Sequence, residues 1–180
     1  FLTETNKENL FFVLEIVKKW KLNRNLLFKT IENFKGLKYR QQIIYKKENL
    51  TIINDSKSTS FSSSISALKI NPNILWLLGG IHKKNDKFNL SKKYFNNIRA
   101  FIYGQNVNFF NKKLKGKIEY ENFINLDKAL KKIFTILKKN KNKPQTLLFS
   151  PCAASFDSFN NFEERGFYFN KLIKRYLYGK

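Results

Sequence analysis

From residue 42 to the end of the chain, short apolar runs that favour β-strands alternate with segments whose apolar residues recur at helical spacing. The expected strands are 42–45, 50–53, 74–78, 100–103, 117–120 and 146–149, and the expected helices are 62–70, 90–98, 107–114, 126–139 and 159–178. The polar stretch 46–49 indicates a hairpin between the first two strands. Strands joined by helices of this length form right-handed βαβ units. The pattern predicts a three-layer, Rossmann-like α/β domain with a mainly parallel sheet.

The first part of the chain has a different pattern. Apolar residues at helical spacing predict a helix over 6–21, and a second helix begins after Asn23, which suits an N-cap, and stops near Gly36. The stretch 36–41 is predicted to be a hinge. We therefore expect residues 1–35 to be helices that belong to another domain, 36–41 to link them, and 42–180 to be the α/β domain.

Composition limits the cellular setting. Hydrophobic residues make up 42% of the 180 residues, which is too many for a disordered tail. We find neither a secretory leader nor a run of about 20 apolar residues that would span a membrane, and the single cysteine fits a reducing compartment. The sequence predicts a cytoplasmic protein with no membrane partner. It contains no methionine and begins with Phe1, so we expect an upstream portion.

The formal charge of +22 raises the alternative of a nucleic-acid-binding module. Nearly all of the basic residues are lysines, however, and arginine, the preferred fork for phosphates and base edges, is scarce. The lysines lie next to abundant asparagine, isoleucine and phenylalanine, as in 138–143, and form no separate basic stripe. Compositional bias explains the charge better than a nucleic-acid partner does.

Ligands of parallel sheets gather at the carboxyl ends of the strands, where three polar loops are expected. The first is Asn54–Thr59. Asp55 could bind ribose hydroxyls, Lys57 a phosphate or carboxylate, and Thr59 an anion near the start of a helix. Ser, Thr and Asp are also ordinary N-cap residues, and on chemistry alone the two interpretations are equally good.

The other two loops are Gly79–Asp86 and Ser150–Gly166. Paired glycines let the backbone approach a ligand, and Lys83 supplies a positive charge, although two glycines often mark only a tight turn. We expect the lone His82 to be solvated and Cys152 to be a buried thiol, because no histidine is positioned to activate it. In the last loop, Asp157, Glu163 and Arg165 are expected to form a local polar network.

Taken together, these loops resemble those of the Mur ligase family, and in particular of its D-glutamate-adding members. The family's carboxyl-terminal domain carries Asn-Asp-Ser-Lys-x-Thr, Gly-Gly-x-x-Lys and Ser-Pro-x-x-x-Ser-x-Asp-x-Phe-x-Asn-Phe-x-x-Arg-Gly, matched here by 54–59, 79–83 and 150–166. Residues 36–40 are similar to the family's Gly-Leu-x-His-Arg hinge, and 5–9 to its His-Asn-x-x-Asn helix start. The resemblance covers nearly the whole chain and implies that 1–35 are the last helices of a central ATP-binding domain.

For the nucleotide, the resemblance implies that Asn6 and Asn9 approach the adenine of ATP, that Arg40 meets its phosphates and that Asp55 meets its ribose. It also assigns a catalytic role to Lys57, near the anionic groups where two domains meet. The cofactors implied are ATP and Mg²⁺, with Mg²⁺ bound mainly by the central domain.

For the amino acid, the resemblance implies two carboxylate sites. Thr59 and Lys83 would hold one carboxylate of D-glutamate, and Ser155 with the backbone N–H groups of Phe156 and Phe162 would hold the other. A dicarboxylate does need two separate anion sites, and a lysine with a hydroxyl and a group of backbone amides can supply them.

The implied reaction joins D-glutamate to UDP-N-acetylmuramoyl-L-alanine through an acyl phosphate formed with ATP, in peptidoglycan synthesis. The implied partners are these substrates and the enzyme's own upstream domains, in a monomer. Thr5, Tyr39 and Ser60 depart from the family pattern, which bears mostly on the nucleotide contacts. No Gly-x-x-x-x-Gly-Lys-Ser/Thr loop occurs in the chain, and the family's metal ligands are not identified, so we expect the ATP-activating centre to lie upstream and the chain alone to be inactive. A ligase for another amino acid, a folylpolyglutamate-type ligase and a defective remnant stay open as alternatives.

Overall fold

The computed structural model describes residues 4–34 and 36–179, which form two compact units that divide between Leu37 and Lys38. This division falls inside the stretch predicted to be a hinge. Each unit is described below by itself. No helix in the described ranges is both long enough and apolar enough to cross a membrane.

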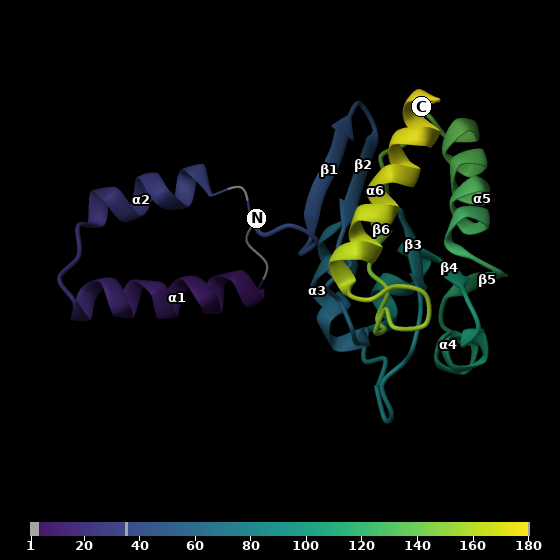
Figure 1. Cartoon of the computed structure of the whole chain (residues 1–180), viewed down its shortest axis with the longest axis horizontal. Helices are drawn as coiled ribbons and strands as arrows, with labels where there is room; N and C mark the ends of the chain where they lie inside the picture. The colour runs from purple at the N-terminus through teal and green to yellow at the C-terminus, as the bar shows by residue number, and fades with distance from the viewer. Residues whose placement is uncertain (1–3, 35, 180) are drawn as a thin grey trace. The chain divides into compact units, whose positions relative to one another are not determined.

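The first unit consists of two helices, α1 (Glu4–Lys19) and α2 (Arg24–Asn33) (Figure 1). The predicted N-cap of α2 is confirmed, because the Asn23 side chain accepts hydrogen bonds from the backbone N–H groups of Asn25 and Leu26. Many large apolar side chains of this unit are exposed. They are Phe11, Phe12, Val13, Leu14, Ile16, Trp20, Leu22, Leu26, Phe28, Ile31 and Phe34. Surface of this kind usually marks a contact with another part of a protein.

The second unit is built on a six-stranded sheet in the order β1-β2-β6-β3-β4-β5. The strands are β1 (Gln42–Lys47), β2 (Leu50–Asn54), β3 (Ile74–Gly79), β4 (Ile98–Tyr103), β5 (Glu119–Phe123) and β6 (Gln145–Phe149). The edge strand β1 pairs antiparallel with β2, as predicted for the hairpin, and every other pairing is parallel. The predicted mainly parallel sheet is confirmed.

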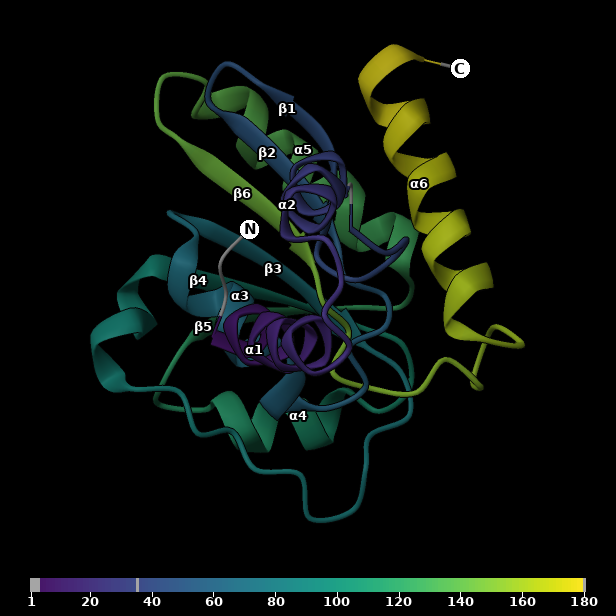
Figure 2. The same cartoon turned by 90° about the vertical axis from the view of Figure 1, so that its left-hand side faces the viewer.

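Helices cover both faces of this sheet (Figures 1 and 2). They are α3 (Phe61–Ile70), α4 (Val107–Leu114), α5 (Leu126–Lys139) and α6 (Phe162–Tyr178). Side chains alternate along a strand, so Ile74, Trp76 and Leu78 of β3 pack with α3 and α4, whereas Leu75 and Leu77 pack with α5 and α6. Because β3 is apolar on both faces, it lies inside the sheet, and the three-layer prediction is confirmed.

Some expected elements differ from the structure. Residues 90–98 were expected to be mostly helical, but only a 3₁₀ helix, η1 (Lys92–Asn97), forms, and Ile98 already belongs to β4. The fifth strand begins at Glu119, later than the predicted start at 117. The strand is held at the sheet edge by Arg99, which pairs with Glu119 and Glu121 at 3.0 and 2.6 Å.

The position of β6 is what assembles the polar loops. This strand comes last in the sequence but lies between β2 and β3, and it is parallel to both. The loops that follow β2, β6 and β3 therefore leave the sheet side by side at the carboxyl ends of these strands, which we call the polar edge of the sheet. The stretches 54–59, 150–161 and 80–86, widely separated in sequence, meet there.

Candidate functional site

The loops after β2 and β6 are joined through Asp55. Its backbone N–H donates to the carbonyl of Phe149 (2.7 Å), and its carboxylate accepts hydrogen bonds from the Ser150 hydroxyl (2.8 Å) and the Gln41 backbone N–H (3.0 Å). Only 5% of Asp55 is exposed, and this burial raises its pKa to about 7, against the lowering effects of Ser150, Gln41 and Arg40. Asp55 therefore ties the hinge to two loops.

The loop after β3 is joined to the loop after β6 by backbone pairing. Ile81 and Ala154 exchange hydrogen bonds of 3.0 and 2.8 Å, and the Gly79 N–H donates to the carbonyl of Pro151 (3.1 Å). Gly80 has a φ of +123°, and a Cβ there would lie 2.5 Å from the Ala154 carbonyl oxygen. Glycine is required at this close approach, so the paired glycines are more than a generic turn.

Lys57 is held at both its backbone and its side chain. The Lys57 N–H donates to the carbonyl of Tyr39 (3.0 Å), and Nζ lies 3.9 Å from the centroid of the Phe162 ring. The distance suits a cation–π contact, which places the Lys57 ammonium at the start of α6. The side chain predicted to be catalytic therefore lies next to one of the residues predicted to bind D-glutamate.

The groups predicted to hold D-glutamate are not engaged elsewhere. Within the described ranges, the side chains of Thr59, Lys83 and Ser155 make no hydrogen bond or ion pair, and the backbone N–H groups of Phe156 and Phe162 donate to no other residue. Phe162 is the first residue of the 17-residue helix α6, so its N–H carries part of the positive end of the helix dipole.

His82 differs from the expectation of a solvated side chain. Its ring stacks on Phe109 of α4, with centroids 3.8 Å apart and planes at 12°, and its Nδ1 is buried. The stack anchors the residue immediately before Lys83. The sequence around His82 gave no signal for this packing, which depends on how α4 lies against the loop.

Cys152 agrees with its prediction. It is fully buried, and burial raises the pKa of its thiol, with the Ser64 hydroxyl 2.9 Å from its sulfur. The thiol stays protonated and is part of the core. The expected network of Asp157, Glu163 and Arg165 is only partly present: Arg165 is buried and acts on Asp157 electrostatically, whereas Glu163 is exposed.

The residues predicted to bind the nucleotide lie in both units. Arg40 is exposed, and the Asp55 carboxylate already accepts hydrogen bonds on both oxygens, so a ribose hydroxyl would have to replace one of them. Asn9 is exposed on α1, and the side chain of Asn6 lies outside the described residues. No spatial relation between these asparagines and Arg40 follows from the structure.

The Tyr39 departure from the family pattern has a structural consequence. Tyr39 has a φ of +61°, and its ring lies against Gly166 of α6, where an added Cβ would meet the ring at 2.4 Å. Gln41 also has a positive φ of +45°. The stretch predicted as a hinge is thus packed against α6 and bonded to the loop after β2.

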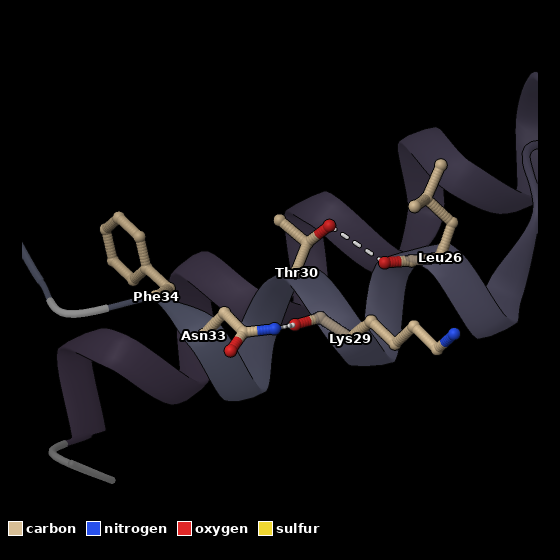
Figure 3. A pocket seen from close by; sticks show the side chains of 5 residues that line it. All are labelled: Leu26, Lys29, Thr30, Asn33 and Phe34. Carbon is tan, nitrogen blue, oxygen red and sulfur yellow. Dashed lines mark hydrogen bonds between the residues drawn. The ribbon is translucent and has the colours of Figure 1, made fainter.

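Each unit has a surface hollow, and the one in the second unit includes Phe156, one of the residues predicted to bind D-glutamate. One, of about 450 Å³, runs along α2 and is lined by residues of that helix and its C-cap (Figure 3). Its polar side chains, Thr30 and Asn33, bond to the helix's own carbonyls, so they do not converge on a ligand. The other, of about 350 Å³, lies in the loop before α6, and its acidic lining, Asp157 and Glu164, would repel a dicarboxylate.

The described residues contain no group of three or more His, Cys, Asp or Glu side chains that could hold a metal ion. The Asp55 carboxylate is committed to Ser150 and Gln41. These residues do not fit a Mg²⁺ site, and no chemical step is assigned to the metal here.

Comparison with known proteins gives a consistent result. No protein-family model matches the chain. It is 34% identical over 171 residues to the UDP-N-acetylmuramoylalanine–D-glutamate ligase of Wolbachia sp. subsp. Brugia malayi, and 33% identical over 174 residues to those of Wolbachia pipientis wMel and Francisella tularensis subsp. tularensis. The alignments cover 95%, 97% and 94% of this chain but 34%, 34% and 41% of these relatives. The chain is thus a homologue of the UDP-N-acetylmuramoylalanine–D-glutamate ligases and spans about a third to two fifths of their length.

Proposed function

We propose that this chain is the carboxyl-terminal part of an ATP-dependent ligase that joins D-glutamate to UDP-N-acetylmuramoyl-L-alanine in peptidoglycan synthesis, in the cytoplasm. Its α/β domain would bind D-glutamate and close over ATP. The observation that carries the proposal is the insertion of β6 between β2 and β3, because it brings the three family-like loops to one edge of the sheet.

Two sets of donors at this edge suit the two acid groups of one amino acid. The Lys83 ammonium and Thr59 hydroxyl would hold one carboxylate, and the Ser155 hydroxyl with the N–H groups of Phe156 and Phe162 would hold the other. All five groups are free of other hydrogen bonds among the described residues. Charge-assisted hydrogen bonds of this kind are worth about 1.5–3 kcal/mol each.

In the proposed reaction, ATP phosphorylates the carboxylate of UDP-N-acetylmuramoyl-L-alanine, and the D-glutamate amine attacks the acyl phosphate. The amide bond forms as phosphate leaves, and the amine loses a proton. This chain's part is to hold D-glutamate by its acid groups so that the amine is free to attack, which is a proximity effect. Lys57, beside Phe162, would face the anionic groups, and Asn6, Asn9, Arg40 and Asp55 would contact the nucleotide.

The helical unit fits the role of the last helices of a central ATP-binding domain. Its exposed apolar side chains, among them Phe12 and Trp20 at 66% and 69% exposure, would be covered by upstream parts of the same enzyme. Those parts would also supply the Mg²⁺ site and the phosphate loop. A monomer is proposed, because one chain would contain the whole site.

Titration of the 180-residue chain with D-glutamate, followed by NMR of the backbone amides, tests the binding site. We expect saturable shifts at Thr59, Lys83, Phe156 and Phe162, with weaker effects from L-glutamate and from D-alanine, which lacks the second acid group. Lys83→Met should weaken binding about tenfold or more, because it removes one charge-assisted contact.

The control is Lys84→Met, which removes an equally exposed lysine from the next position of the same loop and should leave the affinity unchanged. Equal losses in both variants would mean that D-glutamate responds only to the general positive charge. Shifts that do not saturate, or that appear away from the three loops, would refute the proposed site.

A further inference from the structure

Arg165 is a buried charge that the proposed chemistry does not use. It lies in the first turn of α6 and is 1% exposed. Its Nε donates to the Ser56 hydroxyl at 3.1 Å and its Nη2 to the Ser56 carbonyl at 2.7 Å. Burial of a guanidinium costs desolvation free energy unless its N–H groups are hydrogen-bonded. The two hydrogen bonds to Ser56 offset part of this cost and fix the orientation of the guanidinium plane.

Ser56 also bonds to the first residue of α6. Its hydroxyl donates to the carbonyl of Phe162 at 2.8 Å, while its backbone continues directly into Lys57. Lys57 in turn lies with Nζ 3.9 Å from the Phe162 ring centroid. Ser56 thus links the loop after β2 to both Arg165 and the first residue of α6, beside the bonds that Asn54 makes to Gly166 and Asn170.

The same guanidinium also touches the loop after β3. Its Nη1 lies 3.3 Å from where a Cβ on Gly80 would be. This nitrogen is buried, and the guanidinium also interacts with the buried Tyr103 hydroxyl at the end of β4. One side chain thus contacts the loops after β2 and β3 and belongs itself to the element that follows β6.

We propose that Arg165 is a positioning residue that sets the spacing between the Lys57 loop, the start of α6 and the Gly80 turn. This rests on the proposed function, because the spacing matters for a ligand with two acid groups. If the Phe162 N–H and the Thr59–Lys83 pair are held at a fixed separation, the two sets of donors can bind both carboxylates of D-glutamate at the same time. Lys57 is kept on the Phe162 ring, next to the amide that holds one of them.

Lysine cannot replace arginine in this role. The guanidinium is planar and directs separate N–H groups to two acceptors of Ser56 while a third nitrogen lies against Gly80, whereas a lysine ammonium is a compact point charge. Arg165→Lys keeps the charge and loses the geometry. Ser56→Ala keeps Arg165 and removes the hydroxyl that links it to Phe162.

The matched control is Arg175→Lys on the same helix. Arg175 pairs with Asp127 near the other end of α6 and makes no contact with the three loops in the described structure. Its replacement changes the same kind of side chain without touching Ser56. Circular dichroism and urea unfolding establish that each variant is folded.

The first readout needs no ligand. The ring current of Phe162 shifts the NMR signals of the Lys57 side-chain methylenes, and we expect Arg165→Lys and Ser56→Ala to move them towards random-coil values, with no change in Arg175→Lys. The second readout is D-glutamate affinity, which should fall about tenfold in the first two variants and less than about twofold in the control.

Folded Arg165→Lys and Ser56→Ala proteins with the original Lys57 signals would overturn the inference. Should Arg165→Lys fail to fold, Ser56→Ala decides by the same two readouts, because it creates no large cavity. If the unmodified chain binds no D-glutamate, the proposed function fails on its own, and the Lys57 signals still decide whether Arg165 positions the loop.

Discussion

Asp55 belongs to a family motif, but its hydrogen bonds in the structure are made within the protein and differ from those that the motif suggested. Its place in Asn-Asp-Ser-Lys was read from the sequence as a ribose ligand or a helix cap. In the structure it caps no helix: it is 5% exposed and bonded to Gln41 and Ser150. Neither contact was predictable, because Gln41 and Ser150 are 14 and 95 positions away in sequence, and Ser150 reaches Asp55 only through the insertion of β6.

Asp55→Asn should change how stability depends on pH. Burial raises the Asp55 pKa from 3.8 to about 7, so the folded state binds this proton more tightly than the unfolded state does. The resulting stabilisation is complete below about pH 4 and is lost as the pH rises through 7. Each tenfold difference in proton affinity corresponds to about 1.4 kcal/mol, so the unmodified chain should lose a few kcal/mol relative to Asp55→Asn over this range.

Urea unfolding of both proteins at several pH values between 4 and 8 measures this difference. The comparison cancels the effect of the large net charge, which both chains share. Parallel stability curves would show that Asp55 titrates near its ordinary pKa and that its burial is less complete than the structure indicates.

At the scale of elements, the start of α6 is decided by local chemistry that the sequence contains. The helix was expected to begin at Phe159, but it begins at Phe162, because the Asn161 side chain accepts a hydrogen bond from the Glu164 N–H at 2.7 Å. The preceding residues instead form a turn on the Ser155 carbonyl, which accepts from Ser158 and Phe159. This start leaves the Phe162 N–H unbonded at the polar edge.

Asn161→Ala should therefore affect both the helix and the proposed site. Loss of an N-cap costs about 1 kcal/mol, and fraying of the first turn would misdirect the Phe162 N–H. We expect a lower urea midpoint together with weaker D-glutamate binding in the NMR titration. Asn161→Ser keeps a capping side chain and should retain most of the stability and most of the D-glutamate affinity. If Asn161→Ser binds D-glutamate as weakly as Asn161→Ala does, loss of the cap is not the cause.

At the scale of the whole molecule, the chain presents two units, and only the second, Lys38–Lys180, contains an extensive core. The first is a pair of helices with exposed apolar side chains. If the phosphate loop and metal site lie in upstream parts of a complete enzyme, this chain would contribute the proposed D-glutamate site but no group that activates the other substrate.

We therefore expect no ADP release when the chain is mixed with ATP, Mg²⁺, D-glutamate and UDP-N-acetylmuramoyl-L-alanine. The full-length Francisella tularensis ligase, assayed in parallel, serves as the positive control. Turnover by this chain that depends on both D-glutamate and the muramoyl substrate would contradict the proposal that the activating centre lies outside these 180 residues.

The sequence by itself determined the alternation of strands and helices, the hairpin at 42–54, the Asn23 cap and the motif residues of the three loops. All of these depend on local periodicity or on short-range hydrogen bonds, which neighbouring residues specify. Tertiary structure alone decided that β6 enters between β2 and β3, that Arg165 is buried against Ser56, and that His82 stacks on Phe109. Those contacts join residues far apart in the chain, and their energy depends on burial and on hydrogen-bond geometry that exist only once the sheet has formed.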